Sequence, residues 1–135
     1  MTLTGMLERN LNDIPEKTAI VFHDTRISYR ELDTIVNKMA NALVDMGLKK
    51  GDRVGLMLPR IPELVASFLA VARAGGIVVP VNFELKCEDA ETIIRCISPR
   101  FLVVYGQFLG LARRVSQSDP RISIITVDGA MGGTF

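Results

Sequence analysis

Short apolar runs alternate with longer segments of helical periodicity along almost the whole chain. This alternation is typical of units in which parallel strands are joined by helices. Residues 101–104, Phe-Leu-Val-Val, contain no polar residue, as expected for a strand that is covered on both faces. We therefore predict an α/β fold. It is a partial doubly wound, mostly parallel sheet of about five strands flanked by helices and preceded by a short β-hairpin.

Hydrophobic period, capping residues and turn residues place the individual elements. Strands are expected at 18–22, 26–28, 53–58, 77–79, 101–105 and 122–127, the first two forming the hairpin. Helices are expected at 3–11, 29–46, 62–74, 87–97 and 109–115. Residues 1–128 are predicted to form one unit, and residues 129–135 a flexible tail.

The helix after the hairpin carries the clearest local signals. Ser28 and Glu31 match the S-x-x-E capping box, in which each side chain accepts the backbone amide of the other residue. Ile27 and Leu32 are placed to form a hydrophobic staple around this cap. Gly47 is expected to end the helix in the left-handed conformation. The stripe expected to be buried comprises Leu32, Ile35, Val36, Met39, Leu43 and Met46.

Two further helices have apolar faces that suggest how they pack. Pro62 is expected to be the first residue of the helix at 62–74. That helix is apolar on most faces and is predicted to be deeply buried, through Leu64, Val65, Phe68, Leu69, Val71 and Ala72. The helix at 87–97 is predicted to turn Ala90, Ile93, Ile94 and Ile97 inward.

Composition and charge argue against several classes of protein. The net charge is +1, from 16 basic and 15 acidic residues, without the basic stripe expected of a nucleic-acid-binding protein. No apolar run reaches the length of a transmembrane helix, and the N-terminus lacks the features of a secretory signal. Two isolated cysteines without such a signal favour the reducing cytoplasm.

Three blocks of sequence resemble the adenylate-forming superfamily, which includes acyl-CoA synthetases, peptide-synthetase adenylation domains and luciferases. Residues 27–32, Ile-Ser-Tyr-Arg-Glu-Leu, resemble its first core motif. Residues 51–54, Gly-Asp-Arg-Val, followed by an apolar strand and Pro59, resemble the next block. Residues 70–82, a helix ending in Ala-Gly-Gly and a strand ending in Val-Pro-Val-Asn, resemble the second core motif. The match covers residues 10–105 and implies the N-terminal portion of the family's large domain.

Asn82 bears on the subfamily that the resemblance implies. Acyl-CoA synthetases often have Asn at this place after Val-Pro, whereas peptide-synthetase adenylation domains usually have Asp. An AMP-forming acid–CoA ligase is therefore favoured, and a peptide-synthetase adenylation domain is the alternative within the family. In such a ligase a carboxylate attacks the α-phosphate of ATP, giving acyl-adenylate and pyrophosphate. The thiol of CoA then displaces AMP. The whole enzyme would thus use a carboxylic acid, ATP, Mg²⁺ and CoA.

The resemblance assigns no catalytic, cofactor-binding or metal-binding residue to this chain. The family's Ser/Thr/Gly-rich phosphate loop, its adenine and ribose motifs and its catalytic lysine have no counterpart here. The residues that match, among them Glu31, Gly75, Gly76 and Pro80, are structural in the family. The 135 residues alone are expected to be inactive and to self-associate through exposed apolar surface. Fatty, aryl and short-chain acids all stay open as substrates. The alternative from another class is a stand-alone α/β binding or interaction module.

Several residues invite a functional interpretation and were weighed against simpler ones. His23 is expected in a solvated hairpin turn rather than as a base. Cys87 and Cys96 are expected to be ordinary thiols rather than metal ligands. Arg95 and Arg100 suit an anion at a sheet edge, but helix-end and strand-start roles are favoured. Glycines within 129–134 suit a phosphate, yet no lysine follows them. Glu84 stands where some relatives carry an arginine facing CoA, so no CoA contact is assigned there.

Overall fold

The computed structural model describes residues 2–82 and 84–128, without the side chain of Cys87. The predicted tail at 129–135 lies outside these residues. In chain order the elements are α1 (Leu3–Asp13), β1 (Thr18–Phe22), β2 (Thr25–Ser28), α2 (Tyr29–Asp45), β3 (Arg53–Met57), α3 (Pro62–Arg73), β4 (Ile77–Pro80), α4 (Cys87–Ile97), β5 (Phe101–Tyr105), the 3₁₀ turn η1 (Gly106–Phe108), α5 (Leu109–Ser118) and β6 (Ser123–Val127). The α/β architecture with a preceding hairpin is confirmed.

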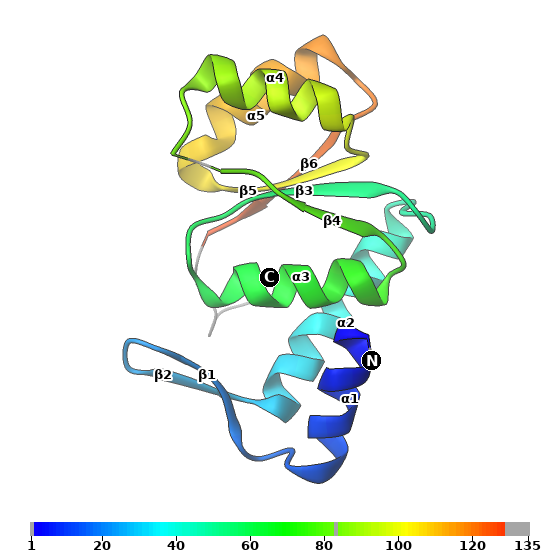
Figure 1. Ribbon diagram of the computed structural model, residues 1–135, viewed down its shortest axis with the longest axis vertical. Helices are drawn as coiled ribbons and strands as arrows, with labels where there is room; N and C mark the ends of the chain where they lie inside the picture. Colours follow the sequence, from blue (N-terminus) through cyan, green and yellow to red (C-terminus); the bar gives the residue numbers. More distant parts are fainter. Residues whose placement is uncertain (1, 83, 129–135) are drawn as a thin grey trace.

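The main sheet has the order β4-β3-β5-β6, and all three of its strand pairs are parallel. It holds four strands among the described residues, against the approximate count of five from the sequence. Helices α4 and α5 cover one face, and α3 covers the other, with α2, α1 and the β1–β2 hairpin beyond it (Figure 1). From β3 the chain passes to β4, which pairs with one edge of β3. It then crosses to β5, which pairs with the other edge of β3. The sheet therefore changes winding direction between β3 and β5.

Helix α2 begins and ends as its sequence predicts. The amide of Glu31 donates to Ser28 Oγ over 3.2 Å, and the amide of Ser28 donates to Glu31 Oε2 over 2.8 Å. Ile27 and Leu32 are both buried in one apolar cluster, as a hydrophobic staple requires. Gly47 has φ +100°, and the amide of Leu48 donates to the carbonyl of Leu43 over 2.9 Å. These bonds satisfy amides and carbonyls that the helix itself leaves free.

The packing of the helices corrects three predictions. Met46 is 46% exposed because it is the C-cap of α2 rather than part of its buried stripe. Ile93 is 37% exposed, while Ala90 and Ile94 make the inward face of α4. Helix α3 is buried on one face only, and Val65 is 42% exposed. The buried residues of α3 are Pro62, Glu63, Ala66, Ser67, Ala70 and Val71, so two polar side chains lie inside.

Candidate functional site

The carboxyl ends of β3 and β5 form the candidate site on topological grounds. Ligands of open parallel sheets bind where the winding direction changes, outside the carboxyl ends of the strands. Met57 and Val104 are register partners at these ends, so the loops that follow them start side by side. The loop after β3 is Leu58-Pro59-Arg60-Ile61, and η1 follows β5. Arg60 and Gln107 are exposed there.

The chemistry of the loops after β3 and β5 does not fit a site for magnesium and a triphosphate. The loops at 58–61 and 106–108 contain no serine, threonine or carboxylate side chain. Such a site needs oxygen ligands for the metal and dense donors around the phosphates. The described residues include no group of three or more His, Cys, Asp or Glu side chains placed to hold a metal ion. The edge can therefore form a wall of a site, and no chemical step follows from its side chains.

Asn82 follows β4 at the same edge of the sheet and has a local structural role. Its Oδ1 accepts the backbone amide of Glu84 over 2.9 Å, which is the geometry of an Asx turn. Both residues are exposed. The residue that distinguishes the subfamilies therefore shapes the loop that leaves β4.

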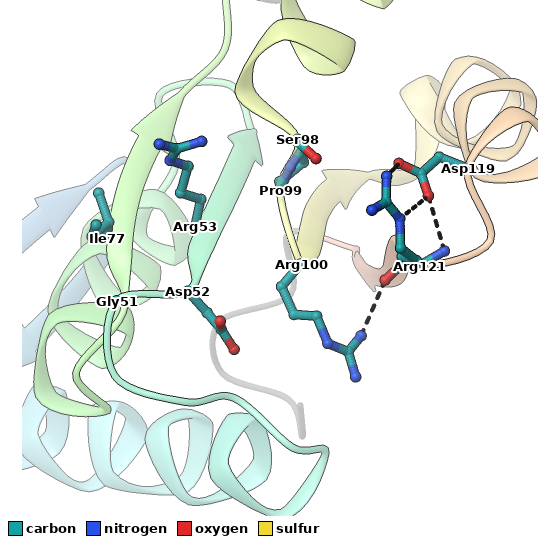
Figure 2. A pocket seen from close by; sticks show the side chains of 9 residues that line it. All are labelled: Gly51, Asp52, Arg53, Ile77, Ser98, Pro99, Arg100, Asp119 and Arg121. Atoms are coloured by element: carbon teal, nitrogen blue, oxygen red, sulfur yellow. Dashed lines mark hydrogen bonds and ion pairs between the residues drawn. The ribbon is translucent and has the colours of Figure 1, made fainter.

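A recess of about 320 Å³ lies at the opposite, amino-terminal edge of the sheet (Figure 2). Its cationic residues stand just before β5 and β6 or at the start of β3: Arg53, Arg100 and Arg121. Figure 2 shows the guanidinium groups of Arg53 and Arg100 pointing away from each other. They do not converge on one point, as the donors of an anion site would.

Each of these arginines already has a partner within the chain. Arg53 Nη1 donates to the carbonyl of Ile97, the last residue of α4, over 2.9 Å. Arg100 Nη1 donates to the carbonyl of Arg121 over 3.2 Å and to Ser123 Oγ over 3.1 Å. The guanidinium of Arg100 also lies 4.9 Å from the centre of the Phe101 ring. Because helix C-termini carry partial negative charge, arginine is favourable where α4 ends. The contacts of Arg100 support its interpretation as a strand-start residue.

Arg121 and Asp119 form a bidentate pair on the rim of this recess. Arg121 Nε donates to Asp119 Oδ1 over 2.9 Å, and Nη2 donates to Oδ2 over 3.0 Å. The hydrogen bond from the Arg121 side chain lowers the pKa of Asp119 below its ordinary value. The same bond raises the pKa of Arg121. The Arg121 side chain is 81% exposed and that of Asp119 is 23% exposed, so the pair organises the turn before β6 at the surface.

The remaining candidates of the sequence lie apart from one another. Arg95 Nη2 is 3.4 Å from Ser118 Oγ and 3.9 Å from Glu91 Oε2, on the α4–α5 side. His23 is exposed in the β1–β2 turn with φ +52°, and its ring contacts that of Phe22. Cys96 is an exposed free thiol on α4. The side chain of Cys87 and the glycines within 129–134 lie outside what the structure describes.

An apolar recess of about 280 Å³ opens between α2, α3 and the strands β5 and β6. Met39, Ala42 and Met46 line it from α2, and Val127 lines it from β6. Ser67 of α3 also lines it, and its buried Oγ has no hydrogen-bond partner among the described residues. Glu63, one turn earlier on α3, is 1% exposed and both its carboxylate oxygens lack a partner there. Burial of Glu63 and Ser67 could not be predicted from the sequence, because α3 carries apolar side chains on most of its faces.

Comparison with known proteins places this architecture in a family. Residues 7–132 match the family model described as AMP-binding enzyme. The chain belongs to the AMP-binding enzyme family. It corresponds to the N-terminal portion of these adenylate-forming enzymes, as the three sequence blocks indicate.

Individual proteins are also similar to this chain in sequence or in structure. The uncharacterized acyl-CoA ligase YtcI of Bacillus subtilis (strain 168) is 35% identical over 114 residues, which are 81% of this chain and 22% of that protein. Surfactin synthase subunit 2 of the same strain is 29% identical over 128 residues, which are 95% of this chain and 3% of that protein. The crystal structure of the anthranilate CoA ligase AuaEII with anthranoyl-AMP superposes with a TM-score of 0.86 at 32% identity, over 92% of this chain and 24% of that one.

The AMP-binding relatives are therefore much longer than this chain, which spans about a fifth of the acyl-CoA ligases that it matches. Both acyl-CoA ligases and a four-domain nonribosomal peptide synthetase of known structure are similar to this chain, so the family match by itself does not choose between the two subfamilies. None of the described helices is long and apolar enough to cross a membrane.

Proposed function

We propose that this chain is the first subdomain, residues 1–128, of the large domain of an AMP-forming acid–CoA ligase. The observation that carries the proposal is the family match over residues 7–132, combined with Asn82 at the end of the second core motif. Curated relatives named as CoA ligases range from 32% to 37% identity, whereas Surfactin synthase subunit 2 reaches 29% and a four-domain nonribosomal peptide synthetase of known structure reaches 26%. These identities support the acid–CoA ligase over the peptide-synthetase alternative.

In the intact protein the proposed reaction has two steps. The carboxylate of an acid attacks the α-phosphate of ATP, forming acyl-adenylate and releasing pyrophosphate. The thiol of CoA then forms the thioester and releases AMP. ATP, CoA, the acid and Mg²⁺ would be bound mainly by the rest of the polypeptide, because the family's phosphate, adenine and ribose motifs and its catalytic lysine have no counterpart in this sequence.

The proposed role of this subdomain is to build and hold one wall of the site. Parallel pairing of β3 with β4 and with β5 holds the carboxyl ends of these three strands side by side. The loops at 58–61, 82–86 and 106–108 leave from those ends. By itself the subdomain is proposed to be unable to adenylate an acid, and acid-dependent exchange of pyrophosphate into ATP by the pure 135 residues would contradict this.

Two further properties belong to this proposal. The exposed free thiol of Cys96 suits a reducing compartment, which supports a cytoplasmic location. The apolar recess and the exposed Met46 support self-association of the isolated chain, because contiguous apolar surface favours association. Light scattering that finds a monodisperse monomer would contradict self-association.

The natural reading frame and an enzyme assay test the proposal. A frame that continues past Phe135 into a Ser/Thr/Gly-rich stretch with Pro-Lys-Gly is expected, and a stop codon there would favour a stand-alone module. The full polypeptide is then expected to convert an acid, ATP and CoA into a thioester, AMP and pyrophosphate. Transfer of an aminoacyl group to a carrier protein without any CoA thioester would instead support the peptide-synthetase alternative.

A further inference from the structure

The apolar recess lies beside an incompletely covered part of the sheet. A parallel sheet normally has both faces covered. Helix α3 packs against β3 and β4, whereas α5 packs against β5 and β6 from the opposite side. On the α3 side, Val127 of the edge strand β6 is 5% exposed in a cluster that includes Leu43 of α2 and Val71 of α3, and the partly buried Ile125 lines the recess beside it. A narrow apolar group can therefore bind in this recess.

Helix α2 presents a self-complementary pattern along the rim of this recess. Ala42 is exposed and small, which allows another helix to approach closely. Lys38 and Asp45 flank it, seven residues and thus about two turns apart, on the same side of the helix. Neither charged side chain makes an ion pair within the described residues. Two such helices running antiparallel, with a twofold axis near Ala42, bring each Lys38 opposite the other copy's Asp45.

We propose that this α2 face, formed by Lys38, Met39, Ala42, Asp45 and Met46 with the adjoining recess, binds a second copy of the chain. The two α2 helices pack antiparallel across a twofold axis near Ala42. The inference rests on the self-association proposed above and names its surface and geometry. It is independent of which acid the intact enzyme activates.

Met46 is the side chain that fills the recess in this arrangement. It is 46% exposed at the end of α2, and the twofold axis places it near Met39 and Ala42 of the other copy. Methionine is flexible and polarizable, so it adapts to an irregular recess. Its sulfur can also accept a weak hydrogen bond from the hydroxyl of Ser67, which has no partner among the described residues. The contact of Met46 with the other copy thus covers apolar surface on both copies.

Sedimentation equilibrium of the purified 135-residue chain over a range of concentrations tests the proposal. The unaltered chain is expected to dimerise, and Met46→Lys is expected to raise the dissociation constant by about tenfold or more. The matched control is Val65→Lys, which alters a similarly exposed apolar residue of α3 outside the recess and should leave dimerisation unchanged. Circular dichroism confirms that each variant is folded.

Charge reversal tests the antiparallel geometry separately. Lys38→Glu alone and Asp45→Lys alone each place like charges together and should weaken dimerisation. An equimolar mixture of the two variants pairs opposite charges again and should restore it as a heterodimer. A monomeric unaltered chain would overturn self-association altogether and imply that other polypeptide covers the recess. A dimer that Met46→Lys leaves intact, or a mixture that fails to associate, would overturn this face while leaving self-association standing.

Discussion

Arg73 in the last turn of α3 joins Asp33 in the first half of α2 through a hydrogen bond of 2.9 Å from Nη1 to Oδ1. Arg73 Nη1 also donates to Asn37 Oδ1 over 2.7 Å, and Asn37 Nδ2 donates back to Asp33 Oδ2 over 3.2 Å. The side chains of Arg73 and Asp33 are only 18% and 17% exposed. Helices α2 and α3 are thus held together by a partly buried polar network.

Replacing Arg73 by methionine should destabilise the chain by about 1–3 kcal/mol, because it leaves a largely buried carboxylate without its cation. The control is Arg9→Met, which breaks a pair whose side chains are 68% and 65% exposed and should cost less than about 1 kcal/mol. Urea unfolding measures both free energies. Equal losses in the two variants would show that the Arg73 network contributes no more than a surface pair.

Two glycines should respond in opposite directions to replacement by alanine. A Cβ at Gly76 would lie 2.9 Å from Val71 Cγ1 and 3.2 Å from the carbonyl oxygen of Asp52, so Gly76→Ala should cost about 1–3 kcal/mol. Gly110 is in α5 with nothing within 4 Å of such a Cβ, so Gly110→Ala should stabilise by about 0.4–1 kcal/mol. Thermal unfolding should separate them: a midpoint that does not fall in Gly76→Ala would contradict the packing at Gly76, and a lowered midpoint in Gly110→Ala would contradict the open space at Gly110.

Replacing Glu63 by an uncharged residue of similar shape should stabilise the folded chain. Both its oxygens are buried without a partner among the described residues, so the carboxylate loses its hydration without compensation. Glu63→Met is therefore expected to raise the free energy of unfolding by about 1–3 kcal/mol. Glu8→Met, on the exposed surface of α1, serves as the control. A clear loss of stability in Glu63→Met would mean that the carboxylate has a partner in solution.

Asp119 should titrate below its ordinary range, because the Arg121 side chain hydrogen-bonds its carboxylate and lowers its pKa. A group whose pKa is lower in the folded chain stabilises that chain above the pKa of the unfolded state. This contribution is lost as the pH falls through the folded pKa. Carboxyl NMR shifts followed against pH should show Arg121→Gln returning the pKa of Asp119 upward. Arg113→Gln should leave the titration unchanged, and an unshifted Asp119 in the unaltered chain would contradict the pair.

Periodicity and capping residues were enough to predict the helices, the hairpin and the parallel strands. Ser28, Glu31 and Gly47 act locally, so their positions in the sequence specify the ends of α2. The orientation of α3 could not be predicted, because apolar side chains lie on most of its surface. In the structure, the small residues Ala66 and Ala70 of α3 point into the buried cluster that α3 shares with α2, whereas Val65 is exposed. That choice depends on how closely two helices can approach, which no single segment encodes.

The place of the candidate site could not be predicted from the sequence, and the absence of catalytic residues stays an expectation from the family resemblance. The winding reversal between β3 and β5 needs the strand order, which is a property of the assembled sheet. The internal partners of Arg53 and Arg100 link residues far apart in the chain, such as Arg53 and Ile97. The buried pair of Glu63 and Ser67 likewise appears only once α3 is placed against its neighbours.

Calorimetric titration of the purified chain with ATP and with CoA, in the presence of Mg²⁺, tests the central claim most directly. The claim is that this subdomain shapes one wall of an AMP-binding enzyme and has no nucleotide or CoA site of its own. The predicted result is no saturable heat with either compound. Saturable binding of ATP or CoA would contradict the claim and make the stand-alone binding module the better account.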